Sequence, residues 1–159
     1  MDPMTLKRQA KGFDRLAKGY DLLVALVYGR SLRKAQSWYL ERVKPGSKVL
    51  ILGGGTGWFL EELLRTGRVA EVDYVELSGR MLELSQKRVE VQLPQEKDRV
   101  NWILGTVYDL EERPCYDLIC TLCFLDLFEG EELESEVQAI IKRISPQGNW
   151  YFSVFCRGD

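Results

Sequence analysis

A short apolar run that ends in a cluster of glycines, residues 49–57 (VLILGGGTG), limits the fold of this chain more than any other stretch. Four apolar residues in a row are typical of a strand buried on both faces, as in a parallel sheet. Gly53, Gly55 and Gly57 allow the backbone to turn sharply and to approach a ligand that any Cβ would block. A helix is predicted directly afterwards, over Trp58–Arg65, and its free N–H groups would point at that ligand. The pattern predicts a nucleotide-type cofactor loop at the C-terminal end of a first strand.

Strands and helices alternate along the rest of the chain. Further strands are predicted over 71–77, Val100–Leu104, Tyr116–Leu122 and 149–155. A helix is predicted over Gly79–Gln92, where Ser78 can cap the first turn, and another over 129–144, where Ile144 would belong to an apolar face. Residues 106–114 are too few for a helix between strands and are predicted as a loop or a single turn. This alternation predicts an α/β fold with a doubly wound, mainly parallel sheet and helices on both of its faces.

The chain is predicted to form a single domain, 1–159, because 159 residues are an ordinary length for one domain. Apolar residues recur at helical spacing near the N-terminus, so residues 1–44 are predicted to form a helical cap region. Residues 45–159 would then form the α/β core that carries the cofactor loop.

Charge and hydropathy exclude several classes of partner. The net charge is −2, which favours neither nucleic acid nor an anionic membrane as the main partner. The longest apolar runs are far short of a membrane span, and the first 18 residues carry charges throughout, unlike a signal peptide. We therefore expect a cytoplasmic protein whose cysteines are reduced.

The four cysteines and the absence of histidine narrow the chemistry further. Cys120 and Cys123 form a CxxC motif, but the sequence has neither a histidine nor a second such motif to complete a zinc site. The motif lies at the end of a predicted strand rather than at the start of a redox helix, which favours buried thiols and no metal site. Because histidine is absent, catalysis would depend on cofactor reactivity, on positioning, and on carboxylate or tyrosine groups.

The spacing of the glycines distinguishes between two classes of cofactor loop. A dinucleotide fingerprint, G-x-G-x-x-G, would place its last glycine at Trp58, and the spacing present is G-x-G-x-G. Glu76 follows the second strand, where a carboxylate can accept hydrogen bonds from both hydroxyls of a ribose; as an alternative, it would only cap a helix. The loop lacks the Lys-Ser/Thr pair of a triphosphate-binding loop. These features together predict an adenosine-type ligand.

Four blocks of sequence carry a resemblance to a known family: VLILGGGTGWFLEELL, VDYVELSGRMLELSQKR, RVNWILGTVYDL and YDLICTLCFLDLF. In order and spacing the chain resembles the class I S-adenosylmethionine-dependent methyltransferases, and the upstream FDRLAKGYD resembles the cap region of the small-molecule branch. The resemblance covers nearly the whole chain. It implies a Rossmann-like sheet, S-adenosylmethionine as the cofactor and a small molecule as the methyl acceptor. The family's sheet normally continues with a sixth and a seventh strand, and we expect both to be missing from a sequence that ends at Asp159.

The resemblance also implies a set of cofactor-binding residues: Tyr20, Gly53, Gly54, Gly55, Thr56, Gly57, Glu76, Leu77, Met81, Thr106, Val107 and Thr121. The glycine loop would line the methionine and ribose parts of the cofactor, and Glu76 would bind the ribose hydroxyls. Leu77 and Met81 would flank the adenine, or belong to the core. Thr121 would face the methionyl end and the substrate, and Tyr20 would close over the cofactor, or only pack within the cap.

The remaining residues of the predicted site, 106 and 107, would lie by the adenine edge. The family usually has an acidic residue where this chain has Ile51, so the amino group of the cofactor would be held by backbone carbonyls or by another side chain. Asp109 and Asp126 are the carboxylates nearest the predicted substrate side, as candidate bases or as ordinary surface residues. No residue is assigned a catalytic role.

Three functions remain open from the sequence. The preferred one is methyl transfer from S-adenosylmethionine to a small molecule, which needs alignment of a nucleophile and exclusion of water rather than a histidine. A second is a non-catalytic methyltransferase-like domain that binds the cofactor weakly or acts through assembly. A third, aminopropyl transfer, would require an aspartate where this chain has Thr121.

The last predicted strand, 149–155, follows a turn at Pro146 and Gly148 and would lie at an edge of the sheet. It is aromatic and apolar and carries no charge, and such an edge readily pairs with another strand. We therefore expect either a homodimer formed through this edge or a chain that is a fragment of a longer protein.

Overall fold

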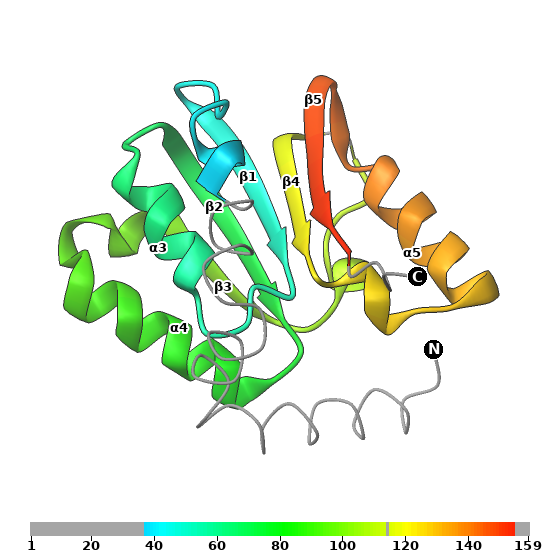
Figure 1. Cartoon of the computed structure of the whole chain (residues 1–159), viewed down its shortest axis with the longest axis horizontal. Helices are drawn as coiled ribbons and strands as arrows, with labels where there is room; N and C mark the ends of the chain where they lie inside the picture. The colour runs from blue at the N-terminus through cyan, green and yellow to red at the C-terminus, as the bar shows by residue number, and fades with distance from the viewer. Residues whose placement is uncertain (1–36, 114, 155–159) are drawn as a thin grey trace, which may run out of the picture.

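A computed structural model describes residues 37–113 and 115–154. In this part of the chain five parallel strands form one sheet with the order β3-β2-β1-β4-β5 (Figure 1). The strands are β1 Ser47–Leu52, β2 Val69–Glu76, β3 Val100–Leu104, β4 Tyr116–Leu122 and β5 Ile144–Ser153. The helices are α3 Trp58–Arg65, α4 Gly79–Gln92 and α5 Gly130–Ile141, with 3-10 turns η1 Pro94–Arg99, η2 Val107–Asp109 and η3 Leu125–Leu127. The predicted α/β fold is confirmed.

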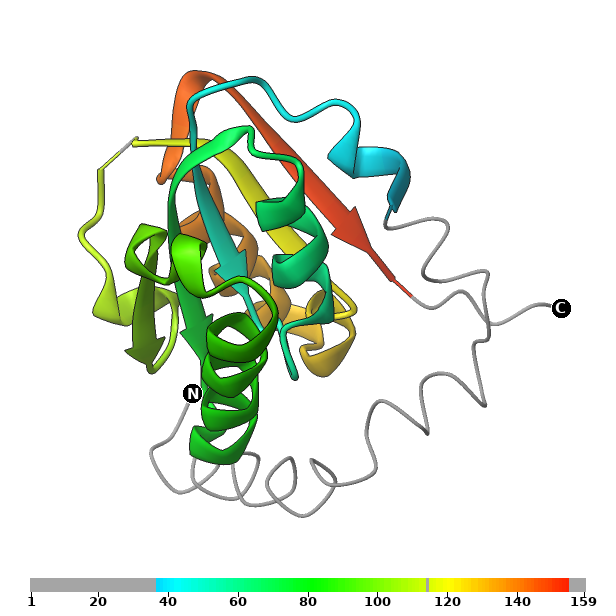
Figure 2. The ribbon, with the colours of Figure 1, turned by 90° about the vertical axis from the view of Figure 1, so that its left-hand side faces the viewer.

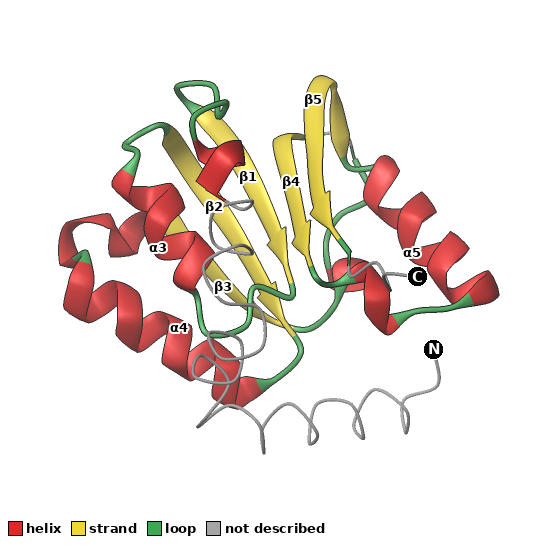
Figure 3. Ribbon diagram, in the orientation of Figure 1, coloured by secondary structure: helices red, strands yellow, loops and turns green. Residues whose placement is uncertain are grey.

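Helices cover both faces of the sheet, as Figures 2 and 3 show: α3 and α4 lie on one side and α5 on the other. Successive residues of β1 point to opposite faces. Val49 and Ile51 therefore pack in the core under α3 and α4, and Leu50 and Leu52 pack in the core under α5. Burial on both faces explains why β1 is apolar throughout.

The order of the strands reverses beside β1, because the chain extends the sheet from β1 to β2 and β3 and then returns to place β4 on the other side of β1. In open parallel sheets, ligands bind outside the carboxyl ends of the strands at such a switch point. The glycine loop follows β1 at this position.

The predicted helix over 129–144 is wrong at its C-terminal end. α5 ends at Ile141, and Ile144 instead begins β5, where it pairs with Tyr116 of β4. The chain turns there because the carbonyl of Arg143 accepts hydrogen bonds from the N–H groups of Cys115 and Tyr116. Parallel pairing with β4 therefore stabilises this segment more than another turn of helix would.

The two residues of the predicted turn, Pro146 and Gly148, lie inside β5. The pairing of β5 with β4 shifts register at this point, between Tyr116 and Leu118 of β4. A strand start at 149 was therefore too late, and the strand end at Phe155 lies outside the described residues. Of the predicted helical cap region, 1–44, residues 1–36 lie outside the described residues, and residues 37–40 are helical. Tyr20 and Cys156 lie outside the described residues as well.

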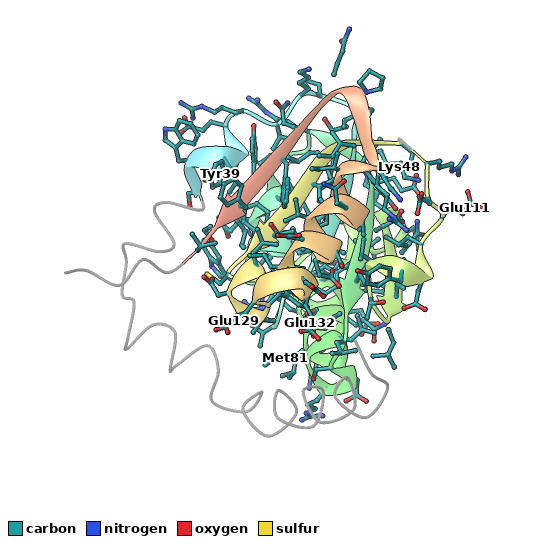
Figure 4. The ribbon with its side chains drawn as sticks, turned by 90° about the vertical axis from the view of Figure 1, so that its right-hand side faces the viewer. Tyr39, Lys48, Met81, Glu111, Glu129 and Glu132 are labelled. Carbon is teal, nitrogen blue, oxygen red and sulfur yellow. The ribbon has the colours of Figure 1, made fainter. Side chains whose placement is uncertain are left out.

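A polar network occupies the amino ends of the strands. The Asp73 carboxylate is buried; its Oδ2 accepts a hydrogen bond from the Tyr116 hydroxyl at 2.6 Å and its Oδ1 one from Asn101 Nδ2 at 2.8 Å. The Lys48 ammonium lies 3.3 Å from Glu71 Oε2. Figure 4 places Lys48 and Met81 at opposite ends of the molecule, so this network is remote from the start of α4.

The β5 strand lies at the edge of the sheet, as the sequence predicted. Tyr39 packs against it, with its ring stacked on Tyr151 at 4.5 Å between centroids and its hydroxyl donating to the Phe152 carbonyl at 3.1 Å (Figure 4). The Phe152 side chain is 49% exposed. Among the described residues, none of the helices is long and apolar enough to span a bilayer.

Candidate functional site

The glycine loop has the backbone that its sequence predicts. Gly53, Gly55 and Gly57 have φ angles of +65°, +61° and +80°, a left-handed region that favours glycine. The Gly53 N–H donates to the Val75 carbonyl at 2.9 Å, and the Gly57 carbonyl accepts the Glu61 N–H at 2.9 Å. The loop is therefore hydrogen-bonded to β2 on one side and to the first turn of α3 on the other.

Two hydroxyl groups support the loop from beneath. Tyr74 of β2 is fully buried and donates to the Gly55 carbonyl at 2.9 Å, and Ser85 of α4 donates to the same carbonyl at 2.7 Å. A Cβ on Gly54 would lie 2.4 Å from the Tyr74 ring, and a Cβ on Gly57 would lie 2.9 Å from the Ser85 Cβ. Gly54 is therefore required by close packing. Sequence reasoning missed Tyr74, although a tyrosine within a buried strand needs a hydrogen-bond partner.

The buried carboxylate of Glu76 connects the glycine loop to α4. Its Oε2 accepts the Gly55 N–H at 3.0 Å, and its Oε1 accepts the Ser78 N–H at 2.9 Å. An ionised carboxylate can accept about four hydrogen bonds, so these two bonds are compatible with binding of a ribose hydroxyl. The position at the tip of β2, facing the loop, agrees with the sequence prediction.

The start of α4 places the two residues predicted to flank an adenine in different environments. The Ser78 hydroxyl caps the helix by accepting the Met81 N–H at 3.1 Å, as predicted. The Met81 side chain is buried, whereas Leu77 is half-buried and precedes the cap. Leu77 is thus the more accessible of the two to a ligand.

The loop after β3 is bonded within itself. The Thr106 N–H and hydroxyl donate to Asp109 Oδ2 at 2.7 and 3.1 Å, and the Thr106 hydroxyl accepts the Tyr108 N–H at 3.3 Å. Val107 is buried under α5. The structure thus brings Thr106 next to the tip of β2, where the Gly105 N–H donates to the Glu76 carbonyl at 3.1 Å, and gives Asp109 a capping role in the loop.

At the end of β4, a different residue from the predicted one approaches the glycines. Thr121 is fully buried, and its hydroxyl accepts the Trp150 indole N–H at 2.9 Å. Phe124 instead packs on the loop, since a Cβ on Gly53 would lie 2.6 Å from its ring. Sequence reasoning missed Phe124, because no local pattern marks which residue of this turn faces β1. Asp126 is exposed within η3.

The described residues also include Ile51 and three of the four cysteines, for which the sequence made predictions. Ile51 is 2% exposed and belongs to the core under α3 and α4, so its side chain offers the loop no polar group. Cys115, Cys120 and Cys123 are free thiols, and burial raises the pKa of Cys120. The described part of the chain contains no cluster of side chains suited to a metal ion.

Comparison with known proteins identifies the family. The model of a methyltransferase domain matches residues 49–148, which include the glycine loop, Glu76 and the loops after β3 and β4. The chain belongs to this methyltransferase family. The predicted membership of the class I S-adenosylmethionine-dependent methyltransferases is thereby confirmed.

Curated relatives of this methyltransferase domain include malonyl-[acyl-carrier protein] O-methyltransferases. That of Priestia megaterium is 31% identical over 110 residues, which are 69% of this chain and 37% of the relative. That of Halorhodospira halophila is 29% identical over 154 residues, 91% of this chain and 47% of the relative. The chain thus spans less than half the length of these relatives.

Solved structures share the fold of the methyltransferase domain at low sequence identity. The complex of DhpI with SAH superposes with a TM-score of 0.75 at 20% identity, covering 92% of this chain and 67% of DhpI. Phosphoethanolamine N-methyltransferase 1 of Haemonchus contortus, in complex with phosphoethanolamine and S-adenosylhomocysteine, gives a TM-score of 0.78 at 13% identity, covering 99% and 34% of the two chains. These likenesses concern the fold.

Proposed function

We propose that this chain binds S-adenosylmethionine at the C-terminal ends of β1 and β2 and transfers its methyl group to a small molecule. The observation that carries the proposal is the contact between the Glu76 carboxylate and the Gly55 N–H at 3.0 Å. It supports the proposal because a carboxylate able to accept hydrogen bonds from ribose hydroxyls lies directly beside the glycine loop at the end of β1. The family membership and the named relatives support the same assignment.

The residues present fit this cofactor. The loop offers backbone N–H and C=O groups without Cβ atoms, Glu76 offers a carboxylate for the ribose, and Leu77 offers a half-buried apolar surface for the adenine. Ile51 is apolar and buried, so backbone carbonyls of the loop would hold the amino group. When bound, the cofactor supplies a sulfonium methyl group that is already reactive towards a nucleophile.

The chain's own residues then orient the acceptor and exclude water, which is the main contribution that such a transfer requires. Phe124 lies against Gly53 and forms an apolar wall on the β4 side of the loop. The relatives named as O-methyltransferases favour a carboxylate as the first acceptor to test. A carboxylate is ionised at neutral pH and needs no general base, which agrees with a sequence that has no histidine.

The predicted homodimer through the β5 edge, the absence of a nucleic-acid partner and the cytoplasmic location stay predictions. The second candidate function is a non-catalytic domain, and the burial of Ile51 at the family's usual acidic position favours it.

Titration calorimetry with S-adenosylhomocysteine tests the proposal. The wild-type chain is expected to bind, and Glu76→Gln to bind roughly 10- to 100-fold more weakly, because hydrogen bonds to a charged group contribute about 1.5–3 kcal/mol. Glu83→Gln is the control: Glu83 lies on the exposed side of α4, paired with Arg80 at 3.0 Å. Absence of binding at millimolar ligand would refute the proposal. Binding without transfer to a malonyl thioester or other carboxylate acceptors would favour the non-catalytic alternative.

A further inference from the structure

Two side chains of α4 donate to successive carbonyl groups of the glycine loop. Ser85 Oγ donates to the Gly55 carbonyl at 2.7 Å, and Arg88 Nε donates to the Thr56 carbonyl at 2.9 Å. Residues three apart lie on the same side of a helix, so one face of α4 carries both donors. Thr56 is itself buried. The loop is therefore supported by α4 as well as by β2.

The Arg88 guanidinium is held by a carboxylate of another helix. Its Nη1 donates to Glu61 Oε2 of α3 at 3.2 Å, and Arg65 Nη2 donates to the other oxygen, Oε1, at 2.6 Å. Burial alone would raise the pKa of the Glu61 carboxyl, but the pKa is lowered, because both arginines donate to its charged form. Arg88 is thus paired with a buried carboxylate that is ionised at neutral pH.

The backbone of Glu61 contacts the glycine loop as well. Its N–H donates to the Gly57 carbonyl at 2.9 Å, so Arg88 and Glu61 bind the carbonyls of two adjacent loop residues and each other. The loop also approaches α4 closely, because a Cβ on Gly57 would lie 2.9 Å from the Ser85 Cβ. Residues 56 and 57 are therefore fixed by α3 and α4 together.

The ion pair of Arg88 and Glu61 is largely withdrawn from water, since the two side chains are 25% and 11% exposed. Such a pair often stabilises a protein no better than apolar residues of similar volume, and its advantage is then a defined geometry. A guanidinium suits this position because its planar fork can bind a carbonyl and a carboxylate at the same time. An apolar side chain at position 88 would pack there without a donor for the Thr56 carbonyl.

We propose that Arg88 is a positioning residue that holds the Thr56 carbonyl, so that the glycine loop presents its backbone to the methionine and ribose parts of the bound cofactor. The inference rests on the proposed function, because it takes this loop as the cofactor-binding loop. Arg88 acts through the loop and needs no contact with the cofactor. The Glu76 carboxylate accepts the Ser78 N–H ahead of the same helix at 2.9 Å. One helix, α4, therefore sets the place of the loop relative to the ribose-binding acid.

Two variants at position 88 separate the bond to the loop from the ion pair. The amide nitrogen of glutamine stands where arginine has Nε, so Arg88→Gln keeps a donor for the Thr56 carbonyl, whereas Arg88→Met has a methyl group there. Both variants lose the ion pair with Glu61. Calorimetry with S-adenosylhomocysteine should show about a 5- to 10-fold loss of affinity for Arg88→Met, the scale of one net hydrogen bond. Arg88→Gln should stay within about twofold of the wild type.

Arg99→Met is the control that separates positioning from general stability. Arg99 makes the same two kinds of contact as Arg88: its Nη1 donates to the Val69 carbonyl at 2.8 Å, and its Nε lies 3.1 Å from Glu96 Oε2. Val69 begins β2, at the opposite end of that strand from the glycine loop. Arg99→Met should lower resistance to urea but keep the wild-type affinity within about twofold. Amide hydrogen exchange of residues 55–57 should be faster in Arg88→Met and unchanged in Arg99→Met.

Equal affinities for Arg88→Met and wild type would overturn the inference, as would an equal loss in Arg88→Gln or in Arg99→Met. Failure of either variant at position 88 to fold would overturn it as well, because Arg88 would then support the whole fold rather than the loop. If the wild-type chain itself does not bind S-adenosylhomocysteine, the proposed function fails instead. The two failures are therefore distinguishable.

Discussion

Replacement of Gly54 by alanine tests whether the glycine loop is limited by packing from beneath. A Cβ at this position would lie 2.4 and 2.6 Å from ring carbons of Tyr74 and 2.6 Å from its hydroxyl oxygen. Gly54 is not among the residues with a positive φ, so alanine meets no backbone strain there. The whole cost must then come from the collision with Tyr74.

The expected cost follows from the surroundings of Tyr74. Its ring is fully buried and cannot move without lengthening the hydrogen bond of its hydroxyl to the Gly55 carbonyl, which is 2.9 Å. Overpacking of a core costs about 1–3 kcal/mol, and a weakened hydrogen bond about 0.5–1.5 kcal/mol. Gly54→Ala should therefore lower the free energy of unfolding by about 2–4 kcal/mol.

A double-mutant cycle isolates the collision. Tyr74→Leu removes all three atoms that the new Cβ would meet. In that background Gly54→Ala should cost less than about 1 kcal/mol, a coupling energy of about 1–3 kcal/mol between the two sites. Urea unfolding followed by tryptophan fluorescence measures each free energy.

Gly67→Ala is the control for the cycle. Gly67 has a φ of +65° but nothing within 4 Å of a built Cβ, so alanine there should cost about 1–2 kcal/mol in either background. If Gly54→Ala costs the same with Tyr74 as with Leu at position 74, within about 0.5 kcal/mol, the packing argument is wrong.

Three further changes have expected outcomes in urea unfolding. Ser78→Ala should lower the free energy of unfolding by about 1 kcal/mol, because the Met81 N–H loses its cap; no change would contradict this. Thr121→Val should cost about 1–3 kcal/mol, because the indole N–H of the half-buried Trp150 loses its acceptor; a neutral result would mean that water replaces it. Burial raises the pKa of Glu136 above its ordinary 4.5, so the stability that this group contributes is present at acid pH and lost as pH rises through the raised value. Glu136→Gln should therefore gain stability relative to wild type as the pH rises above 4.5, and a difference that stays constant with pH would refute the shift.

Local chemistry is enough to predict much of this fold from the sequence. The positive φ angles of Gly53, Gly55 and Gly57 follow from glycine itself, and the cap of α4 follows from Ser78 ahead of an amphipathic segment. The bounds of α3, α4, β3 and β4 agree with the pattern of apolar residues, because period and capping depend on neighbours in the sequence. The place of Glu76 beside the loop follows from strand order, since adjacent parallel strands end at the same edge of a sheet.

Contacts between distant residues were decided only by the tertiary structure. Ile144 continues a helical apolar pattern, but pairing with Tyr116 places it in β5. Phe124 rather than Thr121 reaches the glycine loop, because Trp150 of the next strand engages the threonine hydroxyl in the interior.

The glycine loop shows most clearly which features the sequence determines and which ones the tertiary structure decides. The sequence by itself determined that the backbone turns at the end of β1, because only glycine adopts those φ angles readily. That Tyr74 fills the space under Gly54, and that Arg143, just after α5, donates to the Leu110 carbonyl of the loop after β3, depends on residues brought together by packing. No periodicity or local propensity records such pairs, so only the folded chain reveals them.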